Sequence, residues 1–104
     1  MSKPAQVAVF YLRKDTATFD MSYYLATHMP LVSKAWKPYG LFSYKVTEFG
    51  PESPYSVGCV MDFESIAAYQ NATAAPEAAE VMSDIKNYSS EQPIIAAGEV
   101  VASS

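Results

Sequence analysis

Apolar and polar side chains recur with two different periods along the chain, and these periods predict its elements. Strands are expected at residues 5–12, 41–49, 55–63 and 94–102, where β-branched and aromatic residues concentrate. Helical periodicity covers residues 20–36, 65–73 and 76–88, and the breaker-rich stretches KPYG and GPESP separate neighbouring elements. The resulting βαββαβ order predicts an α+β fold with a ferredoxin-like, four-stranded antiparallel sheet. A length of 104 residues suits a single domain over residues 1–104.

The predicted strands carry apolar side chains on both of their faces. In the strand at 5–12, Val7 and Val9 share one face while Ala8 and Phe10 share the other. An antiparallel sheet that is covered on one face only should instead alternate apolar and polar residues. Two helices cover one face, and apolar area left in water on the other forgoes about 25 cal/mol per Å². We therefore expect a homodimer in which two sheets pack face to face.

The helix at 20–36 holds the only histidine of the chain within its apolar stripe. This residue, His28, has Tyr24 one turn earlier on the same face, and Asp20 is placed to cap the helix N-terminus. Pro30 offers no N–H to the helical ladder, so the helix should kink or restart there. The pattern therefore places the imidazole against the sheet, beside a gap that the break can open.

An imidazole that faces the interior is the best candidate for acid–base chemistry, because it titrates near neutral pH. We expect His28 to act as a general acid/base facing a small apolar pocket, with Tyr24 as the second catalytic residue. Tyr11, Tyr44 and Tyr23 are expected to contact the substrate, since tyrosine joins an apolar ring to a polar tip. The alternative is a histidine that only packs and bonds a backbone carbonyl.

The segment FDMSYYLATHMPLVSKAW, residues 19–36, resembles the signature of the EthD family, small proteins named for ethyl tert-butyl ether degradation. Members carry a Phe-Asp, a Tyr-Tyr pair, a His and a Pro-Leu-Val at this spacing after a first strand, and the element order matches over residues 6–101. The resemblance implies a dimeric α/β barrel with a pocket between sheet and helices in each subunit. It also implies that the motif positions are Asp20, Tyr23, Tyr24, His28 and Pro30.

The resemblance leaves the reaction open. The founding member is associated with a cytochrome P450 ether-degrading system, and relatives in polyketide pathways suggest decarboxylation, dehydration or cyclisation of a small molecule. We therefore expect a cofactor-independent lyase or cyclase acting on a small apolar metabolite, or an accessory protein of an oxygenase system. The alternatives are a non-catalytic carrier that delivers a hydrophobic substrate to an oxygenase, and a structural dimer with a vestigial pocket.

Composition narrows the classes of partner. Half of the residues are hydrophobic and the net charge is −4, which suits a packed core and argues against a nucleic-acid partner. One His and one Cys cannot build the usual zinc site, and no phosphate-binding glycine loop or covalent haem attachment motif occurs. We therefore expect no metal and no cofactor.

Two further features bear on location. The single cysteine, Cys59, cannot form an internal disulfide, which fits a reducing compartment. The apolar run near the N-terminus is too short for a signal-peptide core or a membrane span. A cytoplasmic protein without a membrane partner is expected.

Overall fold

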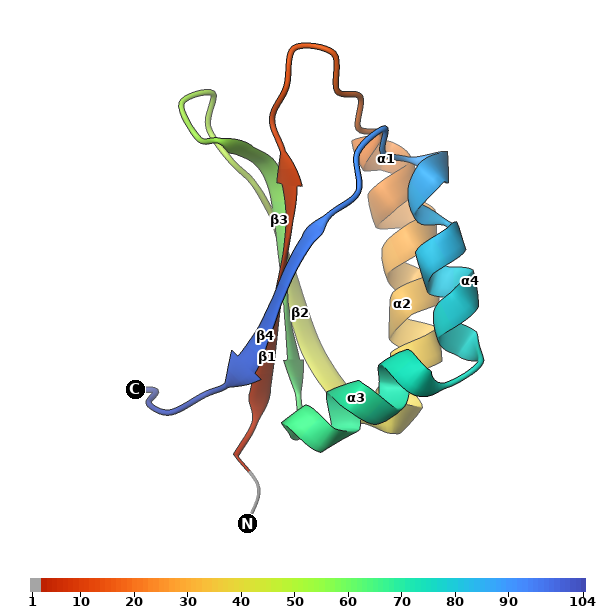
Figure 1. Ribbon diagram of the computed structural model, residues 1–104, viewed down its shortest axis with the longest axis vertical. Helices are drawn as coiled ribbons and strands as arrows, with labels where there is room; N and C mark the ends of the chain where they lie inside the picture. The colour runs from red at the N-terminus through yellow and green to blue at the C-terminus, as the bar shows by residue number, and fades with distance from the viewer. Residues whose placement is uncertain (1–2) are drawn as a thin grey trace.

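The computed structural model describes residues 3–104. Within them, one antiparallel sheet has the strand order β2-β3-β1-β4, and the helices lie against one of its faces (Figure 1). The strands are β1 (Ala5–Leu12), β2 (Leu41–Glu48), β3 (Tyr55–Phe63) and β4 (Ile94–Glu99). The predicted α+β, ferredoxin-like fold is confirmed.

The helical segments of this layer are short and follow one another closely. The first run comprises α1 (Met21–Tyr23), the π-helical segment η1 (Tyr24–His28), α2 (Met29–Trp36) and the 3₁₀ turn η2 (Lys37–Tyr39). The second comprises α3 (Ile66–Ala74), α4 (Glu77–Ser83) and the 3₁₀ turn η3 (Ile85–Asn87). Among the described residues, no helix has both the length and the apolar character that spanning a bilayer requires.

The helix that carries His28 begins as predicted, and its winding changes next to Pro30, where a kink or restart is predicted. The Asp20 side chain caps it by accepting a hydrogen bond from the Tyr23 N–H at 3.0 Å. The chain widens into the π-helical turn η1 just before Pro30, where the Met29 N–H bonds the Tyr24 carbonyl five residues earlier. The α-helical winding restarts at Met29, and Pro30 lies in the first turn of α2. A π-helical turn of this kind often marks a functional site.

The last predicted helix and strand are both shorter than the sequence suggests. The helix expected at 76–88 ends at Ser83, because Asn87 and Tyr88 donate their N–H groups to carbonyls three residues back and tighten the winding. The strand expected at 94–102 ends at Glu99. The tightened segment matters for function, since it supplies the side chains that meet His28.

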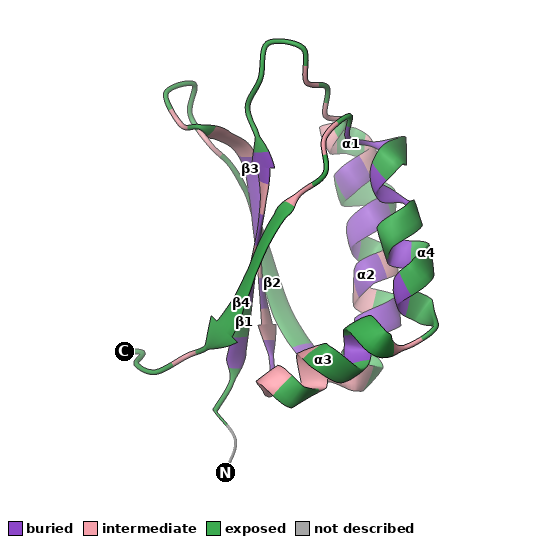
Figure 2. Cartoon of the chain, in the orientation of Figure 1, coloured by how far each residue is buried: buried purple, intermediate pink, exposed green. Residues whose placement is uncertain are grey.

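The core lies between the helices and one face of the sheet, called here the inner face (Figure 2). Alternate residues of β1 and β3 point into it, and Val7, Cys59 and Phe63 are almost fully buried. The opposite, outer face carries Phe10, Leu12, Val60, Ile94 and their neighbours in the pairing register. Ile94 is 48% exposed and Leu12 37%, so much of the outer face's apolar surface is bare.

Candidate functional site

A cavity of about 40 Å³ lies between the inner face of the sheet and the helices. Its wall is built mainly from aliphatic and sulfur-containing side chains of β1, β3, α2 and α4. At the rim, Met82 of α4 and Ile95 of β4 are 46% and 44% exposed, so the cavity opens between these two elements. The residues of the wall that carry polar atoms are Tyr11, Tyr24, His28, Trp36 and Tyr69.

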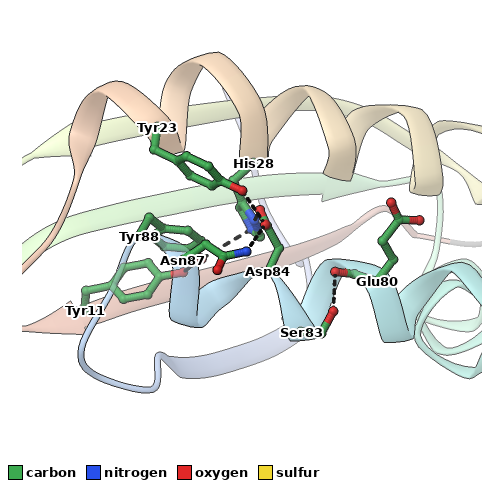
Figure 3. Close-up of polar contacts among 8 residues, drawn as sticks. All are labelled: Tyr11, Tyr23, His28, Glu80, Ser83, Asp84, Asn87 and Tyr88. Atoms are coloured by element: carbon green, nitrogen blue, oxygen red, sulfur yellow. Dashed lines mark hydrogen bonds and ion pairs between the residues drawn. The ribbon is translucent and has the colours of Figure 1, made fainter.

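His28 is 5% exposed and has a hydrogen-bond partner at each ring nitrogen (Figure 3). Its Nδ1 lies 2.9 Å from Asp84 Oδ2, and its Nε2 lies 3.3 Å from the Tyr88 hydroxyl. An ionised carboxylate only accepts hydrogen bonds, so Nδ1 carries the proton and donates it to Asp84. In the neutral ring, Nε2 is then the acceptor and its lone pair faces the Tyr88 hydroxyl.

Asp84 holds the imidazole from the second helical run, and it is itself held by two further donors. The Tyr23 hydroxyl donates to Asp84 Oδ1 at 2.6 Å, and Asn87 Nδ2 donates to the same oxygen at 2.9 Å. Burial acts to raise the pKa of the Asp84 carboxyl, but the hydrogen bonds from Tyr23, Asn87 and His28 outweigh it and leave the pKa lowered. Asp84 is therefore a carboxylate at neutral pH, fixed in direction by three donors.

Burial lowers the pKa of His28 below its ordinary value, and the bond to Asp84 offsets this only in part. The ring is therefore neutral at pH 7, with Nε2 unprotonated. This is the state that a general base requires, and the carboxylate at Nδ1 stabilises the imidazolium that forms when Nε2 gains a proton.

Three tyrosines surround the imidazole, and two of them, Tyr11 and Tyr24, also line the cavity. The Tyr24 ring stacks on His28 with centroids 5.5 Å apart and planes 14° apart, and the Tyr11 and Tyr88 hydroxyls lie 2.5 Å from each other. Burial raises the pKa of Tyr11 to about 12 and also raises the pKa values of Tyr24 and Tyr88. All three keep their hydroxyl protons at neutral pH. Tyr11, Tyr88, His28 and Asp84 thus form one continuous hydrogen-bonded chain.

The predicted site residues separate into those at the cavity and those outside it. His28, Tyr24 and Tyr11 all line the cavity. Tyr23 does not line the cavity. It lies in a separate surface groove, from which its hydroxyl reaches Asp84. Tyr44 does not line the cavity either: it pairs with Met61 on the inner face, but β2 is an edge strand and leaves Tyr44 38% exposed.

Sequence reasoning missed the residues that complete the site, and a backbone carbonyl was the partner of the histidine only in the alternative that it left open. Asp84, not a backbone carbonyl, bonds the imidazole, and Asn87 and Tyr88 join it. The spacing of Asp84, Asn87 and Tyr88 puts them on one side of a helical segment, which was the available signal. Nothing local links them to a histidine 56 residues earlier in the chain.

No cluster of three or more metal-ligating side chains occurs among the described residues. The arrangement offers instead a base, hydroxyl donors and an apolar wall. Fold and site together define a class: ferredoxin-like α+β proteins in which a cavity between sheet and helices is lined by a buried histidine that an aspartate holds from outside the cavity.

Comparison with solved structures places the chain more narrowly. An EthD-like protein from Ralstonia eutropha JMP134 matches with a TM-score of 0.85 and 27% identity, over 98% of this chain and 96% of that one. An ethyl tert-butyl ether degradation (EthD) family protein from Bacillus halodurans C-125 matches with a TM-score of 0.72 and 23% identity, over 94% and 99%. These neighbours confirm the resemblance to the EthD family that the signature predicts.

More distant matches share only the fold. Hydroxynitrile lyase from Passiflora edulis matches with a TM-score of 0.71 and 13% identity, over 99% of this chain and 98% of that one. Other matching structures, at 11% and 13% identity, are described as dimeric ferredoxin-like proteins of unknown function. No protein-family model matches the chain, and no curated protein does.

Proposed function

We propose that the chain binds a small apolar metabolite in the cavity and that His28 transfers a proton to or from it, without a cofactor, as a lyase or cyclase of EthD type. The observation that carries this is the buried His28, which lines a mainly apolar cavity and is bonded to Asp84 and Tyr88 outside it. A buried ionic pair is weak evidence for stability, because well-packed hydrophobic residues do as well or better. An oriented imidazole with its pKa shifted by burial, next to a cavity, is typical of a functional site.

The proposed chemistry needs only groups of this chain. The Tyr88 hydroxyl turns its proton away from Nε2, and neutral His28 accepts a proton there from an acidic bond of the substrate, while the electron pair of that bond stays on the substrate. Asp84 stabilises the imidazolium, and the hydroxyl of Tyr24 can donate to the oxygen on which negative charge develops. The proton then returns to the product or to its leaving group, which regenerates the neutral ring. That an enzyme, hydroxynitrile lyase, shares the fold is compatible with such chemistry.

The second candidate is a carrier that holds the same ligand for an oxygenase and performs no chemistry. The observation that favours it is the wall of the cavity, where apolar side chains greatly outnumber polar ones. Such a wall binds hydrophobic molecules without any need for the imidazole.

We also propose that the protein is a homodimer closed by the outer faces of two sheets. The exposed apolar residues of this face, among them Ile94 and Leu12, support this, as do the fold neighbours that are described as dimeric.

Exchange of the α-hydrogens of small ketones, from acetone to cyclohexanone, in D₂O tests the catalytic proposal. NMR should show that the protein accelerates exchange and that His28→Gln loses about 10²- to 10⁴-fold of the acceleration. Tyr44→Phe, which changes a tyrosine outside the cavity, is the matched control and should exchange like the wild type. Full exchange activity in His28→Gln would refute a catalytic role, and ketone binding without exchange in the wild type would favour the carrier.

A further inference from the structure

The indole N–H of Trp36 is a buried polar group that the described part of the chain leaves without a hydrogen-bond partner. The side chain is 5% exposed, so bulk water does not satisfy it. Leaving a buried donor unpaired costs about 1–3 kcal/mol, and native structures rarely do so without a reason. The aromatic rings that surround it, Phe63 and Tyr69, lie with centroids 6.0 and 6.5 Å away and form no hydrogen bond with it.

Trp36 lines the same cavity as His28. His28 is the residue just before α2 and Trp36 is the last residue of α2, eight positions later, which is about 12 Å along a helix that rises 1.5 Å per residue. Most of the other lining residues are apolar, among them Val32 of α2 and Val7 and Met61 of the sheet. Trp36 and His28 therefore contribute polar groups to a mainly apolar lining from different positions along the helical run.

An ordered water fits poorly beside Trp36. A buried water is held by two to four polar partners, and Tyr69 is the one other lining residue beside Trp36 that carries a polar side-chain atom. An acceptor atom on an otherwise apolar ligand needs no further partner. Because an indole nitrogen donates and never accepts, the group it selects is an acceptor.

We infer that Trp36 is a ligand-binding residue and that its N–H donates to an acceptor oxygen, of ketone, ether or ester type, on the apolar molecule that the cavity takes. The inference rests on the proposed binding function of the cavity but not on proton transfer by His28. Because Trp36 and His28 are eight residues apart on one helical run, the bond to Trp36 would fix which side of the ligand is turned toward the imidazole. The rim between Met82 and Ile95 is the way in.

The test uses the fact that Trp36 is the only tryptophan, so a ¹H–¹⁵N spectrum contains one indole N–H signal to follow. Cyclopentanone and methylenecyclopentane serve as probes, because they share a shape and differ in the acceptor oxygen. The ketone should move the indole proton signal downfield, and the alkene should not. Trp36→Phe should weaken ketone binding about two- to tenfold, which corresponds to a net hydrogen bond of about 0.5–1.5 kcal/mol, and leave alkene binding unchanged.

Two control variants separate this inference from its alternatives. Tyr69→Phe removes the neighbouring hydroxyl and should keep the preference for the ketone. His28→Gln should keep the indole shift even where it abolishes hydrogen exchange, so failure of catalysis and failure of this inference give different results. Equal shifts from both probes, a ketone preference that survives in Trp36→Phe, or no shift from the ketone would each overturn the assignment.

Discussion

The two faces of the sheet are made by the same strands and have opposite characters. On the inner face, which the helices cover (Figure 2), Phe63 and Val7 have no exposed surface, and a polar cluster around His28 joins the two helical runs (Figure 3). On the outer face, Ile94 and Leu12 remain 48% and 37% exposed, and Phe10 stacks on Tyr55 with centroids 4.8 Å apart. Because successive residues of a strand point to opposite faces, one stretch of sequence specifies both surfaces.

The difference shows how tasks are divided within a short chain. The chain's own helices cover the inner face, so polar groups there are shielded from water and have fixed hydrogen-bond partners. The outer face has apolar area but no helical cover, which is the basis of our proposal that a second copy packs against it. If this division holds, substitutions on the inner face change the free energy of unfolding and the site, while substitutions on the outer face change the state of assembly.

The largest expected effect is from truncation of the inner face. Phe63→Ala should lower the free energy of unfolding by about 3–5 kcal/mol, because it deletes a fully buried ring and leaves a cavity. Phe42→Ala, which removes a ring 60% exposed on β2, is the matched control and should cost within about 0.5 kcal/mol. Urea denaturation measures both. Comparable losses for the two variants would contradict the difference in burial.

A charge on the outer face should act on assembly. Ile94→Lys places an ammonium group beside Phe10, its partner in the β1–β4 register, and should convert a dimer to a monomer in light scattering at micromolar concentration. Leu25→Lys, at a site 51% exposed on the helical layer, should leave the mass unchanged. A wild-type protein that is already monomeric under these conditions would end the proposal of a sheet-to-sheet dimer.

The sequence predicted what depends on local pattern. The period of two defined the strands, with the ends of β2 and β4 placed too late, and the capping residue Asp20 defined the start of the first helical run. The apolar stripe correctly placed His28 toward the sheet, because a helix has to bury the side that carries its apolar residues.

The sequence could not predict contacts that only the tertiary fold creates. The pairing of His28 with Asp84 joins two helical runs that are far apart in the chain, and it depends on the tightened turn after Ser83. The exposure of Tyr44 could not be predicted either. Strand parity gives it the inner face, but its exposure depends on the place of β2 at the edge of the sheet, which the strand's own residues do not encode.

The pH dependence of stability tests the enclosed state of His28. Burial lowers the pKa of the folded imidazole, so below about pH 6.5 the unfolded chain binds a proton more readily than the folded one. The free energy of unfolding should therefore fall as the pH drops from 7 to 5, by at most about 1.4 kcal/mol per pH unit for this one group. His28→Gln should flatten that part of the curve, measured by urea denaturation at each pH. Glu52→Gln, at an exposed turn, should keep the wild-type dependence of the free energy of unfolding on pH.

The lowered pKa of the Asp84 carboxyl also makes the free energy of unfolding fall on acidification, but in a lower pH range than His28 does. Its contribution is present above the ordinary carboxyl range and is lost as the pH falls through the folded value. A stability that rises on acidification between pH 7 and 5, or an unchanged slope in His28→Gln, would show that the imidazole is not the buried neutral group described above.

The smallest expected effect concerns the cap that starts the site-bearing helix. Asp20→Ala removes the acceptor for the Tyr23 N–H and should lower the free energy of unfolding by about 1 kcal/mol. The mass of the assembly should not change, since Asp20 lies on the helical layer, away from the outer face. Asp15→Ala, which removes an exposed loop carboxylate, should cost within about 0.5 kcal/mol and separates capping from loss of charge. A change in assembly caused by Asp20→Ala would mean that the two faces of the sheet are coupled and that the division of tasks between them does not hold.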